Sequence, residues 1–160
     1  MKLSENFSLA EMIKSNTATR MGIDNSPSDE HLENLKLLCE NVLQKVRDEH
    51  GPVRVSSGYR SPDLNAAIGG STASQHSKGQ AADFECSSIS NYDLAVWIHD
   101  NLDYDQLILE FYTAGEPSSG WIHVSYKDGG NRKQALTAVK ENVATITGKG
   151  KTVYKVGLIE

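Results

Sequence analysis

The stretch SQHSKGQAAD, residues 74–83, places a histidine and an aspartate seven positions apart, with Gly79 between them. Imidazole nitrogens and carboxylate oxygens are common zinc ligands in proteins, and a glycine suits a tight turn between a loop and a strand. An isolated His-x6-Asp pair arises easily by chance, but the pattern SxHxxGxAxD restricts several further positions. The stretch therefore indicates that His76 and Asp83 form part of a metal site.

A third ligand is expected in the stretch GWIHVSY, which alternates like a strand and places Trp121, His123 and Ser125 on one face. Two neutral imidazoles and one carboxylate leave a tetrahedral zinc with one open position, as in catalytic zinc sites. Other divalent ions accept the same ligands. The alternative is a packed or surface histidine, as we expect for the chain's other histidines, which are His31, His50 and His99.

Arg60 lies in the stretch SGYRS, directly after a predicted short strand. At the end of a strand, its planar guanidinium can polarise a scissile carbonyl or bind a carboxylate. A surface ion pair is the simpler alternative.

The hydrophobic pattern predicts the elements that must position these residues. Apolar residues recur with a helical period from Leu32 to Val46, and Gly51 is a natural end for that helix. Strands are predicted from period-two alternation, at 53–57, 79–87, 104–112 and 121–126. The segment 134–144 is left unassigned, and 152–159 is a short strand or an extended tail. The order of elements predicts an α+β fold with a small, mostly antiparallel sheet.

Length and composition limit the functional classes. The 160 residues predict one domain, 1–160, with its motif-bearing core at about 51–130 and a C-terminal extension at about 131–160. The net charge of −5 and the lack of a basic patch argue against nucleic acid as a partner. The sequence shows no signal peptide and no apolar run near the ~20 residues of a membrane span. Cys39 and Cys86 are expected to be free thiols.

Together, SGYRS, SxHxxGxAxD and WIHVS resemble the zinc D-alanyl-D-alanine carboxypeptidase family, particularly its short phage and bacterial members, over residues 7 to 130. The resemblance implies one zinc per chain, bound by His76, Asp83 and His123. It implies that Arg60 contacts the substrate carbonyl and stabilises the oxyanion. Three further residues are implied to line the substrate cleft: Ser71, Ser74 and Gln75. The implied fold has helices on one face of the sheet and the zinc cleft on the other.

The chain departs from the family at one position. Several members carry the general base three residues before the last zinc histidine, where this sequence has Gly120. The nearest acids are Glu110 in LILEF and Glu116 in a Gly/Pro/Ser turn. We predict Glu110 as the base, because its strand is expected to pair with the strand that carries His123. An acid at an exposed strand edge is the alternative.

The resemblance implies a zinc metallopeptidase that cuts D-amino-acid-containing stem peptides of peptidoglycan, as a carboxypeptidase on D-Ala-D-Ala or as an endopeptidase on an L-Ala-D-Glu bond. A monomer is expected. Without a signal peptide, the expected setting is a phage endolysin in the host cytoplasm with holin-type release, or a virion-associated hydrolase. The alternative is a non-catalytic, zinc-stabilised module that binds peptidoglycan or serves as a structural phage component.

Overall fold

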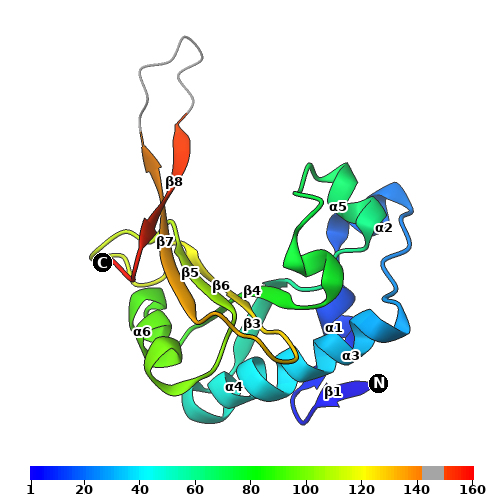
Figure 1. Ribbon diagram of the computed structural model, residues 1–160, viewed down its shortest axis with the longest axis horizontal. Coiled ribbons are helices and arrows are strands. Elements are labelled where there is room, and N and C mark those ends of the chain that lie inside the picture. The colour runs from blue at the N-terminus through cyan, green and yellow to red at the C-terminus, as the bar shows by residue number, and fades with distance from the viewer. Residues whose placement is uncertain (142–149) are drawn as a thin grey trace.

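The protein is built around a six-stranded sheet with the strand order β3-β4-β6-β5-β7-β8. The computed structural model describes residues 1–141 and 150–160 (Figure 1). The strands of this sheet are β3 (Val53–Ser57), β4 (Ala81–Cys86), β5 (Gln106–Glu110), β6 (Trp121–Ser125), β7 (Gln134–Glu141) and β8 (Lys151–Val156). A separate two-stranded sheet pairs β1 (Lys2–Ser4) with β2 (Phe7–Ser8).

The large sheet is mostly antiparallel, with β5 and β7 as its parallel pair. Together with the helices, this confirms the predicted α+β class. The segment at 152–159 proves to contain a strand, β8. Of the unassigned segment 134–144, β7 takes the part up to Glu141, and the rest lies outside the described residues. The C-terminal segment thus adds two strands to the sheet that carries the predicted site.

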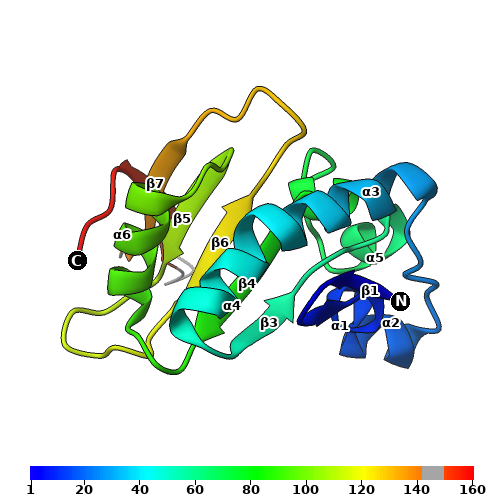
Figure 2. The same cartoon turned by 90° about the horizontal axis from the view of Figure 1, so that it is seen from below.

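One face of the sheet is covered by a long helical segment and by α6 (Asn91–Asn101) (Figure 2). The long segment was predicted as one helix but consists of α3 (Asp29–Leu38), a π-helical turn η1 (Cys39–Leu43) and α4 (Gln44–His50). The π turn places Cys39, Val42 and Leu43 together in the core. The helical segment ends at Gly51, whose φ of 90° suits glycine.

Alternation along the central strands separates the core from the opposite face. Phe84, Ile122 and Leu109 point toward the helices and belong to the hydrophobic core. Because successive side chains of a strand point to opposite faces, their neighbours Asp83 and His123 point away from the helices. The helices therefore support the sheet from behind and leave its other face available for a site, as the resemblance implied.

The remaining helices are short, and serine side chains cap them. They are α1 (Leu9–Ile13), α2 (Asn16–Met21), α5 (Pro62–Ala67) and the 3-10 turn η2 (Gln75–Lys78). The hydroxyl of Ser61 accepts a hydrogen bond from the backbone N–H of Leu64 at the start of α5. Ser74 does the same for His76 at the start of η2. Such caps satisfy N–H groups that the first turn leaves free, and they fix the loops that flank the site.

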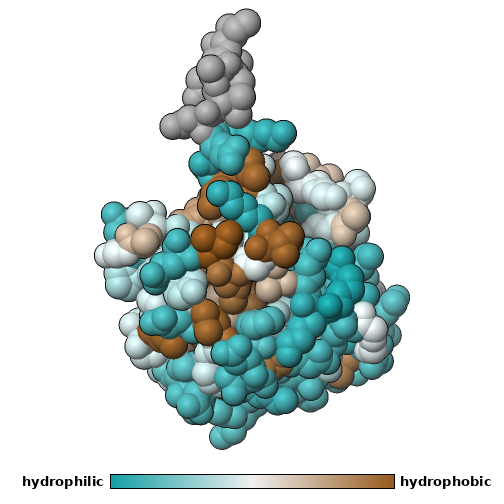
Figure 3. All heavy atoms as spheres, turned by 60° about the vertical axis from the view of Figure 1, so that its left-hand side comes forward, coloured by the Kyte–Doolittle hydropathy of each residue, from teal (hydrophilic) through white to brown (hydrophobic). Residues whose placement is uncertain are grey.

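Two further features bear on the protein's surroundings. Cys39 and Cys86 are buried free thiols, as predicted. None of the helices in the described part of the chain combines the length and apolar character needed to cross a bilayer. Apolar side chains gather on the side that Figure 3 brings forward. Among the described residues of the C-terminal segment, the exposed large apolar side chains are Tyr154, Val156 and Ile159.

Candidate active site

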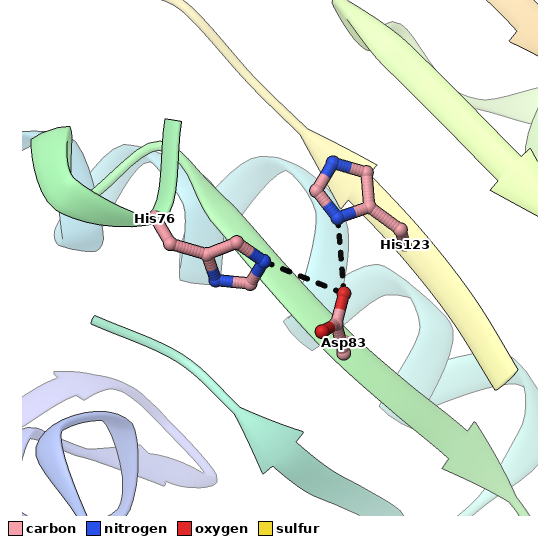
Figure 4. Close-up of side chains that lie close together, drawn as sticks. All are labelled: His76, Asp83 and His123. Atoms are coloured by element: carbon pink, nitrogen blue, oxygen red, sulfur yellow. Dashed lines mark hydrogen bonds and ion pairs between the residues drawn. The ribbon is translucent and has the colours of Figure 1, made fainter. Parts of the chain in front are cut away.

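Asp83 and His123 form a direct cross-strand pair between β4 and β6. Directly opposed residues of an antiparallel pair hold their Cβ atoms about 5 Å apart on one face. The side chains meet there, with 3.0 Å between Nδ1 of His123 and Oδ1 of Asp83 (Figure 4). The pairing of β4 with β6 thus brings together two predicted ligands that are 40 residues apart in the sequence.

His76 reaches the same carboxylate from η2, in the loop before β4. Its Nε2 lies 3.4 Å from Oδ1 of Asp83 (Figure 4). Its Nδ1 lies 2.8 Å from the backbone carbonyl of Gly58, to which it can donate. A partner of this kind orients a ligating imidazole and leaves the other nitrogen available for a metal. The buried His76 ring is therefore held with Nε2 facing Asp83.

Gly79 makes this approach of loop and strand possible. Its φ is 73°, and a Cβ there would lie 2.4 Å from the backbone oxygen of His31. The turn that carries His76 therefore packs against α3 more closely than any side chain at position 79 would allow. This is the physical reason for the glycine in the motif SxHxxGxAxD.

The three side chains fit a divalent cation. One ligand atom from each of His76, Asp83 and His123 can be chosen so that all lie within 4.8 Å of one another. Burial raises the pKa of Asp83, but hydrogen bonds from His123 and His76 outweigh burial and hold that pKa well below its usual range. The carboxylate is thus ionised at neutral pH, as a metal ligand must be. Within the described residues, no other group of three or more His, Cys, Asp or Glu side chains has such geometry.

Arg60 approaches the same carboxylate from the loop after β3. Its Nη2 lies 3.7 Å from Oδ2 of Asp83, and its Nε donates to the hydroxyl of Ser57. Its backbone N–H donates to the carbonyl of His76. With its side chain only 20% exposed, Arg60 is held in place and does not form the surface ion pair that was the simpler alternative.

Glu110 lies at the end of β5, opposite Trp121 of β6, while Ile108 lies opposite His123. Glu110 is therefore a diagonal neighbour of His123 on the same face of the sheet. Burial raises the pKa of Glu110, and so does the negative charge of Asp83, while His123, Trp121 and Arg60 lower it less. The buried indole N–H of Trp121 has no hydrogen-bond partner among the described residues, although it lies near enough to affect this pKa.

Gly120 cannot carry an acidic side chain in this fold. Its φ is 65°, and a Cβ would lie 2.0 Å from the backbone oxygen of Glu110. The backbone of the strand that carries Glu110 thus leaves no space for a side chain at the position where several family members have the acid. Glu116 is exposed and lies in the turn between β5 and β6, where it bridges to Thr113. Glu116 does not line the cleft that contains Glu110.

The predicted residues line one cleft of about 670 Å³. Its walls contain the three predicted metal ligands with Arg60 and Glu110, and also the predicted substrate-binding residues, which are Ser71, Ser74 and Gln75. Two of these are already engaged within the protein, because Ser74 caps η2 and Gln75 donates to Asp105. A larger hollow of about 740 Å³ lies along β3, but it contains no histidine. The chemical groups gather in the smaller cleft.

Other residues of the cleft were not found from the sequence. They include Asp105, Lys127, Arg132 and Tyr154. Asp105 precedes β5 and Arg132 precedes β7, so only the parallel pairing of these strands brings them together. The buried Asp105, an acid at the edge of an apolar strand, was the one local signal.

The three histidines outside the site have structural partners. His31 hydrogen-bonds to the hydroxyl of Tyr59, and His99 to that of Tyr104. His50 packs edge-on against Trp97. His31 and His50 are half-buried and His99 is exposed, so these histidines are packed or surface residues, as expected.

Comparison with known proteins supports the geometry. A search of curated proteins found no match. The family model described as Peptidase M15 matches residues 5–125, which include all three predicted metal ligands, Arg60 and Glu110. M15 peptidases are typically zinc-dependent, and the donor set found here suits zinc. Because the match covers most of the 160 residues, this chain belongs to the M15 metallopeptidases, the zinc D-Ala-D-Ala carboxypeptidase-like family.

Proposed function

We propose that this protein hydrolyses peptide bonds in the stem peptides of peptidoglycan, with substrates that contain D-amino acids. The observation that carries the proposal is the convergence of His76, Asp83 and His123 in one cleft with Glu110 and Arg60. A metal ligand set, a carboxylate of raised pKa and a guanidinium can together catalyse amide hydrolysis. Membership of the M15 family supports this substrate class.

Each side chain has a distinct task in this proposal. His76, Asp83 and His123 hold one zinc ion, which supplies Lewis-acid polarisation of the scissile carbonyl and activation of water when it is bound. Glu110 takes a proton from the attacking water and delivers one to the leaving amine. Its raised pKa brings it nearer to neutral pH, where a base can also act as an acid. Arg60 stabilises negative charge on the carbonyl oxygen, since Ser57 fixes its Nε and its terminal nitrogens face the site.

The alternative of a non-catalytic wall-binding module depended on Gly120, where an acid was expected. Glu110 now supplies a carboxylate in the same cleft, and its backbone is the reason why position 120 is glycine. This arrangement favours the enzyme. We further propose that the protein acts as a monomer and serves as a phage endolysin, released from the host cytoplasm by a holin, or as a virion-associated hydrolase.

The proposal is tested on purified protein by two measurements made together: bound zinc per chain, and release of new amino groups from purified peptidoglycan with and without a chelator. We expect about one zinc per chain, activity that is lost on chelation, and recovery when zinc is added. Mass analysis of the released peptides then identifies the bond. One zinc without release from walls of several chemotypes would overturn the enzymatic proposal and favour the binding module.

A further inference from the structure

We propose that Lys127 and Arg132 form an anion subsite at one end of the cleft, which binds a substrate carboxylate two or three residues from the scissile bond. The proposal rests on the proposed function and specifies its substrate as a stem peptide whose acidic residue lies two or three residues from the bond that is cut. Both side chains line the cleft. Both also follow Ser125, where the family match ends, so the two cations lie outside the part of the chain that the family model matches.

The buried carboxylate of Asp105 builds this subsite. Asp105 is 1% exposed and accepts hydrogen bonds from Nε, Nη2 and the backbone N–H of Arg132. Gln75 donates to the same carboxylate, and Nζ of Lys127 lies 3.5 Å from it. A guanidinium whose Nε and Nη2 are already bonded to a buried carboxylate loses little further conformational freedom when it binds an anion. Asp105 is therefore a positioning residue for Arg132.

The charges at this end favour an anion. Among the side chains that line this end of the cleft, one carboxylate, Asp105, faces two cations, Lys127 and Arg132, so the lining keeps one excess positive charge. The side chains of Arg132 and Lys127 are 53% and 36% exposed, so both can reach a ligand while they contact Asp105. The whole chain has a net charge of −5, so this local excess runs against the overall charge. Lys78 adds a further cation to the cleft wall.

The strand register gives the distance from the reaction centre. Ile108 of β5 lies opposite His123. Glu110 ends β5 two residues after Ile108, and Asp105 precedes β5 at its other end. Three residues of a strand span on the order of 10 Å. The predicted base and the cations thus lie on opposite sides of the metal ligands.

An extended peptide advances about 3.3–3.6 Å per residue, so a carboxylate held by Arg132 lies two or three residues from the bond at the metal centre. The terminal carboxylate of a D-Ala-D-Ala end is only one residue from its scissile bond. In a stem that ends γ-D-Glu-L-Lys-D-Ala-D-Ala, the glutamate α-carboxyl lies two to three residues from that bond. The location therefore fits the glutamate carboxylate better than the terminal one.

The test measures binding of three probes to the zinc-loaded Glu110→Gln protein, so that no probe is consumed. The probes are the stem pentapeptide L-Ala-γ-D-Glu-L-Lys-D-Ala-D-Ala, its form with the glutamate α-carboxyl amidated, and its form with the C-terminus amidated. We expect amidation of the glutamate α-carboxyl to weaken binding about tenfold, as for the loss of a charge-assisted hydrogen bond, and amidation of the C-terminus to weaken it less. Adding Arg132→Gln should remove the difference between the probes, and adding Lys127→Gln should reduce it.

Two controls separate local from general effects. Lys45→Gln removes one positive charge from the exposed side of α4 and should keep the tenfold difference. Asp105→Asn combined with Arg132→Gln removes both charges of the pair, so it tests the subsite even if Arg132→Gln alone fails to fold with an unpaired buried carboxylate.

The outcomes distinguish this proposal from the proposed function. Equal binding of the three probes, no binding of any probe, or an unchanged difference in the Arg132→Gln protein overturns the subsite, whether or not the wild type cleaves walls. It is also overturned if the wild type cuts the bond next to the sensitive carboxyl. Carboxyl-dependent binding that Arg132→Gln abolishes supports the subsite, even if hydrolysis of walls is not detected.

Discussion

The backbone carbonyl of Glu110 occupies the space that a side chain at Gly120 would need, 2.0 Å from the ideal Cβ position. Glu110 is the last residue of β5, and Gly120 directly precedes β6. The close approach of these two strands has two consequences. It excludes an acid three residues before His123, and it places the carboxylate of Glu110 on the same face as the metal ligands. In this fold, the acid is supplied by the neighbouring strand.

Replacing Gly120 should therefore cost more than backbone strain alone. We expect Gly120→Ala to lower the free energy of unfolding by about 1–2 kcal/mol for its left-handed backbone and by about 1–3 kcal/mol more for the clash. Urea unfolding measures the total. Gly129→Ala is the matched control, because Gly129 has a φ of 86° and open space around its Cβ position. Equal losses in both variants would show that Glu110 does not restrict position 120.

Glu110→Gln should abolish turnover and leave the metal in place. Removing a general base typically lowers kcat by about 100- to 10,000-fold, and the amide keeps the size of the side chain. The measurements are kcat on a stem peptide and zinc per chain. Glu116→Gln changes an exposed acid in the turn between β5 and β6 and should keep nearly full activity. If Glu116→Gln were the inactive variant, the base would be misassigned.

His76→Ala should remove the response of thermal stability to metal. A ligand that binds only the folded state at 100 times its Kd stabilises that state by about 2.7 kcal/mol. We expect a chelator to lower the Tm of the wild type and leave that of His76→Ala unchanged. His99→Gln, which changes a histidine bonded to Tyr104, should respond to the chelator as the wild type does. A Tm of His76→Ala that still falls on chelation would argue against His76 as a ligand.

Asp105 should make stability depend on pH in the acid range. Burial raises its pKa, but hydrogen bonds from Arg132 and Gln75 outweigh burial and lower the pKa from 3.8 to about 2. A carboxyl with a lowered pKa in the folded state stabilises that state above its unfolded pKa, and this contribution is lost as pH falls from about 4 to 2. The shift corresponds to about 2 kcal/mol.

Urea unfolding between pH 7 and pH 2.5 measures this contribution. Asp105→Asn should be less stable than the wild type by about 2 kcal/mol at pH 7, and the difference should shrink as the pH falls toward 2. Asp128→Asn, the same change at an exposed position, should follow the wild-type curve. A constant difference between Asp105→Asn and the wild type across this range would contradict the assignment.

Much of the fold could be predicted because its signals are local. The helical period from Leu32 to Val46 and the alternation around Asp83 and His123 depend on neighbours within one element, where hydrophobic periodicity is informative. The capping hydrogen bonds from the backbone of Glu11 to Ser8 and from that of Asp93 to Ser90 are equally local, since each joins residues three positions apart. The π turn at Cys39–Leu43 was missed, because it keeps an apolar pattern like that of an ordinary helix.

The candidate site divides in the same way. His76 and Asp83 lie within one short motif, and the sequence alone was enough to connect them and to indicate the M15 family. The tertiary structure decided which acid faces the metal ligands, because the position of Glu110 depends on the pairing of β5 with β6. It also decided that Asp105 meets Arg132, through the parallel pairing of β5 with β7. Register between distant strands depends on the packing of the whole sheet, so a single sequence carries no local signal for it.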